Sequence, residues 1–367
     1  MEARTALLIS DPINIRYLTG FMGLAPEERE AYCLLINSQV HLFVSSLYVE
    51  SASKIVNQPK QDSNTTNTTN NQIITTAFSR KKPIEKALAE ILMQNDVTTL
   101  EFEKYDATVA EYEKLQKELP GVTLVPSFGR IEKMRMVKSK KEIEMIKKAC
   151  ALTDACFTHL LSYIKEGQTE SEIAWEIETF FHKNGASSSF SPIVAFNEHS
   201  SQPHYNSLSQ WAQSNQGLAL KSNSLIFLDF GARVDGYCAD MTRVVFLGTP
   251  KDEWVNAYKT VLKAQQEALL YLSCHSRENG NPDQKETESP IHTSPIGFAW
   301  RGESGMTTPL SGAKADEIAK KIISDAGYPV YPHGLGHGVG LAIHEAPRLS
   351  TARDELLTPG NVFSVEP

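Results

Sequence analysis

Apolar residues recur along the first part of the chain with two periods, which predict strands interleaved with helices. The runs Tyr32–Ile36 and His41–Val44 flank Asn37-Ser38, a pattern typical of a hairpin. Helical spacing follows in Pro83–Gln94 and in Ala107–Leu119. We therefore expect this part of the chain to form a small α/β layer.

The second part of the chain opens on a long predicted helix. Ser139 and Glu142 have the spacing of a capping box ahead of a helical pattern that reaches residue 165. Thr169 starts the same pattern again, and that helix is expected to end near Gly185. Beyond it, we expect strands at 190–196, 225–230 and 237–247, and helices at 255–272 and 314–326.

The chain has 367 residues, which fits two domains better than one core. We place them at 1–130 and 131–367. Residues 58–76 are rich in Asn, Thr, Gln and Ser and are expected to form an unpacked loop. Residues 274–306 mix Pro, Ser, Asn and Gly between two predicted helices, so we interpret them as an insertion.

Composition excludes several classes of protein. The net charge is -8, and no dense cluster of Lys and Arg is present, which argues against nucleic acid as a partner. No apolar run approaches the roughly 18 residues of a membrane span or forms a signal peptide. The five cysteines are scattered without the spacing of a disulfide framework, which indicates a reducing compartment, and we expect the cytoplasm.

Two aspartates in strand-like segments are the first candidates for chemistry. A predicted turn at 233–236 joins the two segments and is expected to set Asp229 opposite Asp240. Like charges on opposed strands repel, and a carboxylate among apolar residues is costly, so a cation between them would relieve both penalties. The alternative, a turn or capping aspartate, suits Asp235 but not Asp229.

Histidines and glycines concentrate in residues 331–347, where three histidines lie among four glycines. Glycine permits close backbone approach, and imidazole binds metals and transfers protons near neutral pH. Glu366 lies on a predicted strand at 361–367 and shares a face with Ser364, although a plain strand-end acid would fit as well. The histidines of these segments and of the upstream segment 189–205 are His199, His204, His333, His337 and His344.

The order and spacing of these residues resemble those of the pita-bread metallopeptidases, which include methionine aminopeptidase, prolidase, Xaa-Pro aminopeptidase and creatinase. The segment Ser10–Phe21 is similar to the N-terminal domain of the proline-directed members and creatinase, and Lys138–Lys147 is similar to their domain junction. The implied fold is α/β (α+β). It comprises a creatinase-like domain at 1–130 and a pita-bread domain with a curved antiparallel sheet at 131–367.

The resemblance also implies a site and an activity. Its motifs match Asp229, Asp240, His337 and Glu366 to ligands of two divalent metal ions. Manganese is expected, and cobalt, zinc or iron would also fit such a site. His204 and His333 would bind substrate, and the catalytic set would be His204, His344 and Glu366, with Glu366 transferring a proton. The implied reaction is hydrolysis between an N-terminal residue and proline, by a homodimer.

The sequence departs from the family pattern in ways that lower the expected activity. The family's fifth ligand is a second glutamate beyond Val-Glu-Pro, whereas the printed chain ends at Pro367. The family's first helix is also missing or shortened, and residues 274–306 interrupt a helix-turn-helix connection that is normally brief. We therefore interpret the chain as C-terminally truncated and expect little or no peptidase activity from residues 1–367.

Several readings stay open at this stage. The segment His344-Glu-Ala-Pro347 favours a Xaa-Pro aminopeptidase over a prolidase, but it does not decide between them. An inactive remnant could act as a binding or dimerising protein, and its metal content would distinguish it from an enzyme. A creatinase-like amidinohydrolase would share the fold without needing two metals.

Overall fold

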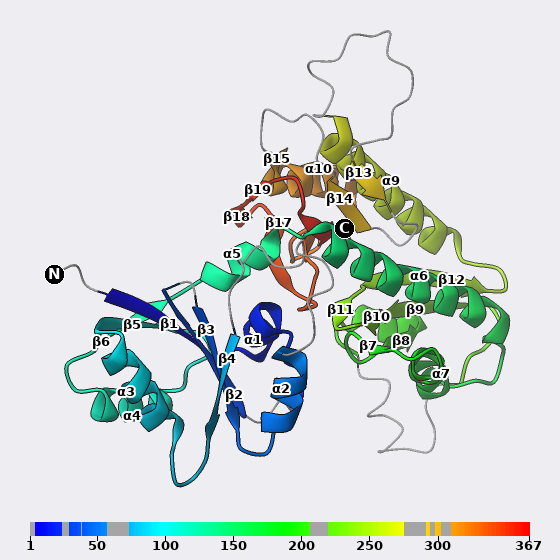
Figure 1. The fold of residues 1–367 in the computed structure, drawn as a ribbon. Coiled ribbons are helices and arrows are strands. Elements are labelled where there is room, and N and C mark those ends of the chain that lie inside the picture. The colour runs from blue at the N-terminus through cyan, green and yellow to red at the C-terminus, as the bar shows by residue number, and fades with distance from the viewer. Residues whose placement is uncertain are drawn as a thin grey trace. The chain divides into compact units, whose positions relative to one another are not determined.

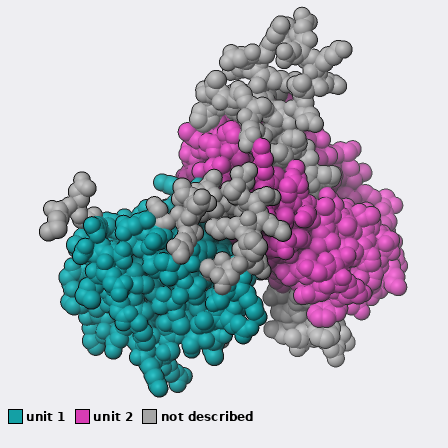
Figure 2. Space-filling model, in the orientation of Figure 1, with its two compact units in different colours: residues 1–135 teal, residues 136–367 magenta. Residues whose placement is uncertain are grey.

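The computed structural model describes residues 4–23, 29–37, 39–56, 73–205, 219–274, 291–293, 298–301 and 310–367. Contacts divide the chain into two compact units, Met1–Arg135 and Met136–Pro367 (Figure 2). Among the described residues, no helix combines the length and hydrophobicity that crossing a membrane requires.

Unit 1 is built on a mixed sheet of six strands in the order β4-β3-β2-β1-β5-β6 (Figure 1). The predicted hairpin is confirmed, because β2 and β3 pair antiparallel with Cys33 opposite Leu42. Strand β1 is parallel to β5, which is parallel to β6. The strands are β1 (Arg4–Ile9), β2 (Ala31–Ile36), β3 (Gln39–Ser45), β4 (Ile73–Phe78), β5 (Val97–Glu103) and β6 (Thr123–Ser127).

Two hydrophobic cores of unit 1 are formed by its helices together with its sheet. Leu88 and Leu115 share one core with Leu34 of the sheet, whereas Ile15 shares a second core with Leu42. The predicted α/β architecture is confirmed. Successive side chains of a strand point to opposite faces of the sheet, so continuous apolar runs make both faces of the sheet apolar. The helices are α1 (Pro12–Thr19), α2 (Val49–Val56), α3 (Ile84–Gln94), α4 (Val109–Glu118) and α5 (Arg130–Met136).

The loop predicted at 58–76 is wrong at its C-terminal end. Residues 73–76 belong to β4, where Ile73 pairs with Val40 of β3 in parallel. The reason is the β-branched run Ile-Ile-Thr-Thr, which suits a strand and outweighs the polar residues before it. The remainder of the predicted loop, residues 58–72, lies outside the described residues.

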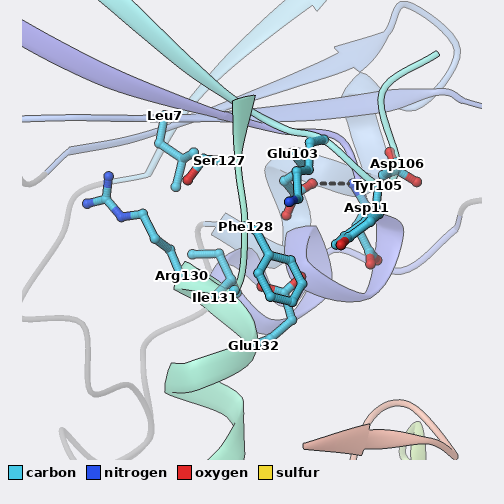
Figure 3. A pocket seen from close by; sticks show the side chains of 12 residues that line it. Leu7, Asp11, Glu103, Tyr105, Asp106, Ser127, Phe128, Arg130, Ile131 and Glu132 are labelled. Atoms are coloured by element: carbon cyan, nitrogen blue, oxygen red, sulfur yellow. Dashed lines mark hydrogen bonds between the residues drawn. The ribbon is translucent and has the colours of Figure 1, made fainter. Parts of the chain in front are cut away.

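The carboxyl ends of β1, β5 and β6 surround a small cavity of about 130 Å³ (Figure 3). Glu103, at the end of β5, accepts hydrogen bonds from the backbone N–H groups of Ser10 and Asp11 and from the Asn14 amide, at 2.7, 2.8 and 2.6 Å. Burial raises the pKa of Glu103, and these hydrogen bonds counteract part of that shift. The carboxylate thus ties the segment after β1 to β5.

Unit 2 begins with two capped helices. Both predicted capping boxes are present, with Ser139 and Thr169 as N-cap residues. The first core of unit 2 lies between these helices and the aspartate-bearing strands, and a second core lies under α9 and α10. The helices of unit 2 are α6 (Lys140–Tyr163), α7 (Glu170–Lys183), η1 (Asn197–Ser201), α9 (Asp252–Cys274) and α10 (Gly312–Asp325).

The strands of unit 2 pair antiparallel in short sheets, as expected for the pita-bread fold (Figure 1). They are β7 (Ser187–Ser188), β8 (Ile193–Phe196), β9 (Ser224–Phe230), β10 (Ala232–Val234), β11 (Tyr237–Cys238), β12 (Met241–Leu247), β13 (Ile291–Thr293), β14 (Phe298–Arg301), β15 (Leu310–Ser311), β16 (Gly336–Gly338), β17 (Glu345–Ser350), β18 (Arg353–Asp354), β19 (Leu356–Leu357) and β20 (Val362–Ser364).

The segment 274–306, interpreted from sequence as an insertion, contains regular structure. Cys274 ends α9, and β13 and β14 both fall inside the segment. Strand β14 pairs with β20, with Phe298 opposite Ser364. The short apolar run Phe298-Ala-Trp300 explains how a strand forms amid residues that otherwise favour turns. The rest of the segment lies outside the described residues.

Candidate metal centre

Asp229 and Asp240 enter the site from neighbouring parts of one antiparallel pair. The turn predicted between them is confirmed, since Asp235 and Gly236 have φ angles of 46° and 81°. The predicted pairing is wrong, however: Asp229 lies opposite Thr242, and Asp240 occupies the break between β11 and β12. Alternation along β9 directs Leu228 and Phe230 into the core, so Asp229 faces the opposite side.

Gly231 explains why the pairing breaks at this point. A Cβ on residue 231 would lie only 1.8 Å from the carbonyl oxygen of Ala239, so only glycine allows that approach. The register is nevertheless the same on both sides of the break, because Phe230 lies opposite Met241 and Arg233 lies opposite Cys238. Nearby, the Thr242 hydroxyl donates a hydrogen bond of 3.3 Å to Oδ1 of Asp229.

His337 is the buried centre of the cluster. Its Nε2 lies 3.5 Å from Oδ2 of Asp240 and 3.0 Å from Oε1 of Glu366. Its ring also meets that of His344 edge to face, with centroids 4.3 Å apart. The glycines beside it are required, because a Cβ on Gly336 would lie 2.0 Å from the carbonyl oxygen of Ser364. The glycine-rich pattern therefore serves close strand packing around His337.

Glu366 follows β20 and is held by its neighbours. The Ser364 hydroxyl donates to Oε1 of Glu366 at 2.6 Å, which agrees with the shared strand face predicted from sequence. The backbone N–H of Glu366 donates to Leu335 at 2.7 Å, and that of His337 donates to Ser364 Oγ at 3.1 Å. These bonds join the last strand to the histidine segment.

A further hydrogen bond connects the histidine segment to the aspartate-bearing strands. The backbone N–H of Cys238 donates to the carbonyl oxygen of Gly340 at 2.8 Å. Asp240 follows Cys238 by two residues, and His337 precedes Gly340 by three. The bond thus explains how residues from separate sheets meet in one cluster.

The electrostatics of the cluster show an excess of negative charge. Burial raises the pKa of Asp229 well above its ordinary value, and the carboxylates of Asp240 and Glu366 raise it further. Burial also raises the pKa of Asp240, although the hydrogen bond from His337 opposes this. The cluster therefore holds three carboxylates and one imidazole, and a bound cation would balance the remaining negative charge.

Among the described residues of the cluster, His337 has a pKa that favours a positive charge. Burial by itself would lower its pKa, but the hydrogen bonds to Asp240 and Glu366 outweigh burial and raise it to about 10. Burial would likewise raise the pKa of Glu366, whereas His337 and the Ser364 hydroxyl bring it below its ordinary value. For His344, burial and the neighbouring His337 both lower the pKa.

The donor set fits a divalent cation. The ligand atoms of Asp240, His337 and His344 lie within 4.8 Å of one another among the described residues. Carboxylate and imidazole donors suit manganese, cobalt, zinc and iron. A cation here would offset both the burial of the Asp229 carboxylate and its repulsion by Asp240 and Glu366, which together raise its pKa.

The remaining predicted residues lie differently. His333 is exposed and stacks on Tyr331 with ring centroids 4.8 Å apart. His204 is exposed and has a φ of 63°, and no hydrogen bond, ion pair or ring contact within the described ranges joins it to the cluster. The structure therefore brings Asp229, Asp240, His337, His344 and Glu366 together but not His204.

Sequence reasoning missed the residue that anchors the His204 segment. Glu170 is 2% exposed and accepts hydrogen bonds from the Phe196 backbone N–H at 2.6 Å and from the Tyr205 hydroxyl at 2.7 Å. His199 Nδ1 lies 2.8 Å from the same carboxylate. A glutamate in a first helical turn ordinarily faces water, so the sequence held no signal for this role.

Comparisons with known proteins agree with this fold and site. Residues 144–274 and 302–367 match the model of metallopeptidase family M24, and residues 3–137 match the creatinase/prolidase N-terminal domain. The chain therefore belongs to metallopeptidase family M24, a family whose members use divalent metal ions.

Three relatives illustrate the likeness. An uncharacterised peptidase of Bacillus subtilis is 29% identical over 98% of this chain and 85% of its own length. The structure of a Xaa-Pro dipeptidase from Bacillus anthracis has a TM-score of 0.76 at 29% identity, over 99% of this chain and 84% of that one. An X-Pro aminopeptidase from Thermotoga maritima has a TM-score of 0.73 at 25% identity, over 99% and 87%.

Proposed function

We propose that this protein is a divalent-metal-dependent peptidase that hydrolyses the bond between an N-terminal residue and proline. The observation that carries the proposal is the meeting of His337 with Asp240 and Glu366, at 3.5 and 3.0 Å, from separate strands. Structural neighbours described as a Xaa-Pro dipeptidase and an X-Pro aminopeptidase support the proline specificity.

In this proposal Asp229, Asp240, His337 and Glu366 hold two divalent ions, with manganese the expected metal. Bound cations of this kind polarise a carbonyl oxygen and make water a nucleophile at neutral pH. The four side chains supply three carboxylates and one imidazole. Homodimer formation and a cytoplasmic location stay predictions.

His344 and Glu366 act on the substrate side of the cluster. Burial lowers the pKa of His344, which favours the neutral imidazole, and its ring N–H donates to the scissile carbonyl oxygen. The Ser364 hydroxyl donates to Oε1 of Glu366 and favours its ionised form, so this carboxylate takes a proton from the water that attacks the carbonyl carbon and returns it to the proline nitrogen as the C–N bond breaks. His333 and His204 are proposed to contact the ends of the substrate.

The experiment combines metal analysis with substrate choice. The chain is purified, incubated with Mn²⁺, desalted, and analysed for metal per chain, and it is then assayed on a Xaa-Pro dipeptide, a Xaa-Pro-Xaa tripeptide and creatine. We expect two ions per chain and chelator-sensitive release of the first residue from a proline peptide. The tripeptide separates an aminopeptidase from a dipeptidase.

Metal content is the primary readout, because it tests the proposed centre whichever substrate is chosen. One weakly held ion or none would contradict the proposed centre. Cleavage of creatine in preference to both peptides would contradict the proposed substrate class.

A further inference from the structure

Lys138 is a buried lysine outside the predicted ligand set. Its side chain is 1% exposed, and its Nζ lies 2.7 Å from Oε1 of Glu345, whose side chain is 6% exposed. Lysine is almost never fully buried unless it is paired, and taking both charges out of water costs several kcal/mol per ion. A buried ion pair is therefore weak evidence that the pair stabilises the fold. Its role follows from the segments that it holds in position.

The Glu345 carboxylate lies against the loop that carries His344. The backbone N–H of Ala342 approaches Oε2 of Glu345 at 3.4 Å, and a Cβ on Gly340 would lie 2.4 Å from Oε1. The loop closes on itself, because the N–H of Gly340 donates to the carbonyl oxygen of Ala342 at 3.1 Å. Residues 340–344 therefore wrap around the carboxylate, and His344 precedes Glu345 directly.

The backbone beside Lys138 is fastened to the second segment of the site. The N–H of Lys138 donates to the carbonyl oxygen of Gly360 at 2.8 Å, and the Asn361 amide donates to the carbonyl oxygen of Met136 at 3.0 Å. Gly360 has a φ of 87°, and a Cβ there would lie 2.8 Å from Val137. Strand β20 starts at the next residue but one, and it leads to Glu366.

We propose that Lys138 is a positioning residue of the candidate metal centre: by pairing with Glu345 it fixes the loop 340–344 and so holds the His344 ring against His337. The inference rests on the proposed function, in which His344 contacts the substrate. Lys138 acts through Glu345, which is not a proposed ligand. Its backbone bonds keep the same short segment, Met136–Lys138, in register with the turn before β20.

The test observes the His344 ring directly. The protein is labelled with ¹⁵N-histidine, and the ring signal of His344 is assigned by its loss in His344→Gln. Lys138→Met leaves a buried glutamate unpaired and risks unfolding. The main variant is therefore the double substitution Lys138→Met with Glu345→Gln, which removes both charges at nearly constant volume.

The double substitution Lys320→Met with Asp316→Asn is the matched control. Lys320 also forms an ion pair with a buried aspartate of unit 2, with Nζ 2.7 Å from Oδ2 of Asp316, but it belongs to α10. We expect the wild type and the control to show one sharp His344 signal. The main variant should lose that signal through broadening or a shift toward the value of an exposed histidine, and its affinity for Ala-Pro should fall about tenfold.

Metal titration keeps this inference separate from the proposed function. If the main variant is folded and its His344 signal matches that of the wild type, Lys138 has only a structural role and the inference is overturned. Unchanged metal affinity alongside a displaced His344 supports it. Failure of the wild type itself to bind Mn²⁺ would instead contradict the proposed function, whatever the His344 signal shows.

Discussion

The Nε2 atom of His337 lies 3.0 Å from Oε1 of Glu366, so the glycine-rich segment and the last strand meet at one point. The positions of both side chains depend on close backbone packing, because Gly336 lies so near the carbonyl group of Ser364 that a Cβ atom would not fit. A side chain on residue 336 would push the two strands apart. Gly336→Ala should therefore reduce metal affinity at least about tenfold, the scale of supporting contacts around metal ligands. Calorimetric titration with Mn²⁺ checks this, and wild-type affinity in a folded variant would contradict it.

Substitution of a proposed ligand should remove metal and activity together. Asp229→Asn or His337→Ala takes away a donor, and we expect the affinity for Mn²⁺ to fall at least about a hundredfold. Metal analysis after desalting provides the measurement. Retention of stoichiometric metal by both variants would refute the ligand assignment.

His344 has two possible roles, which one variant separates. In the proposed function His344→Ala and His204→Ala keep the metal and lose mainly the rate, by about 100-fold or more. The donor atoms of His344 nevertheless lie within 4.8 Å of those of Asp240 and His337. Metal analysis decides: loss of metal in His344→Ala would make His344 a ligand.

Glu170 should matter to catalysis through the loop it anchors. Glu170→Gln weakens the hydrogen bonds to His199 and Tyr205 and leaves a buried amide, so we expect a loss of about 1–3 kcal/mol in the free energy of unfolding and a lower rate with unchanged metal content. Glu172→Gln on the same helical turn is the control, because Glu172 is exposed and caps the helix. Equal effects of the two substitutions on rate would contradict an anchoring role for Glu170.

Asp316 predicts an acid-dependent contribution to stability. Burial would raise its pKa, but hydrogen bonds from Lys320, Thr351 and Tyr331 outweigh burial and bring the pKa below the ordinary 3.8. A carboxylate with a depressed folded pKa contributes stability that is fully present above its unfolded pKa and is lost as pH falls through the folded value.

The corresponding variant is Asp316→Asn. It should lower the free energy of unfolding by about 3 kcal/mol at pH 7, and the difference from wild type should shrink only below pH of about 4. Urea unfolding at a series of pH values measures this difference. A difference that grew on acidification would contradict the sign of the pKa shift.

Much of the fold was predictable where local pattern decides. The capping boxes at Ser139 and Thr169, the β2–β3 hairpin and the turn at Asp235-Gly236 all depend on residues close together in sequence. Asp229 lies opposite Thr242 and not Asp240 because the two-residue turn at Asp235-Gly236 sets one register from Val234–Tyr237 through Asp229–Thr242. The close passage of Gly231 along Ala239 depends on packing and was not predictable.

The cluster of acids and histidines was predictable from residue types, but its supports were not. Glu170 and Lys138 look like surface residues at the starts of helices, and only packing shows them buried. The first residues of β4 were assigned to a loop because the polar tract before them obscured a short β-branched run. Sequence patterns reveal chemistry more readily than the contacts that orient it.

The central claim is that Asp240 belongs to a metal centre, and Mn²⁺ binding to three proteins tests it most directly. Wild type, Asp240→Asn and Asp235→Asn are titrated with Mn²⁺ and followed by electron paramagnetic resonance of the free ion. Asp235 is the control because it occupies a turn at a φ of 46°, a conformation that asparagine adopts readily. The account predicts saturable binding of two ions by wild type and Asp235→Asn, with binding by Asp240→Asn weakened at least about a hundredfold. Equal binding by all three proteins, or no binding by wild type, would contradict it.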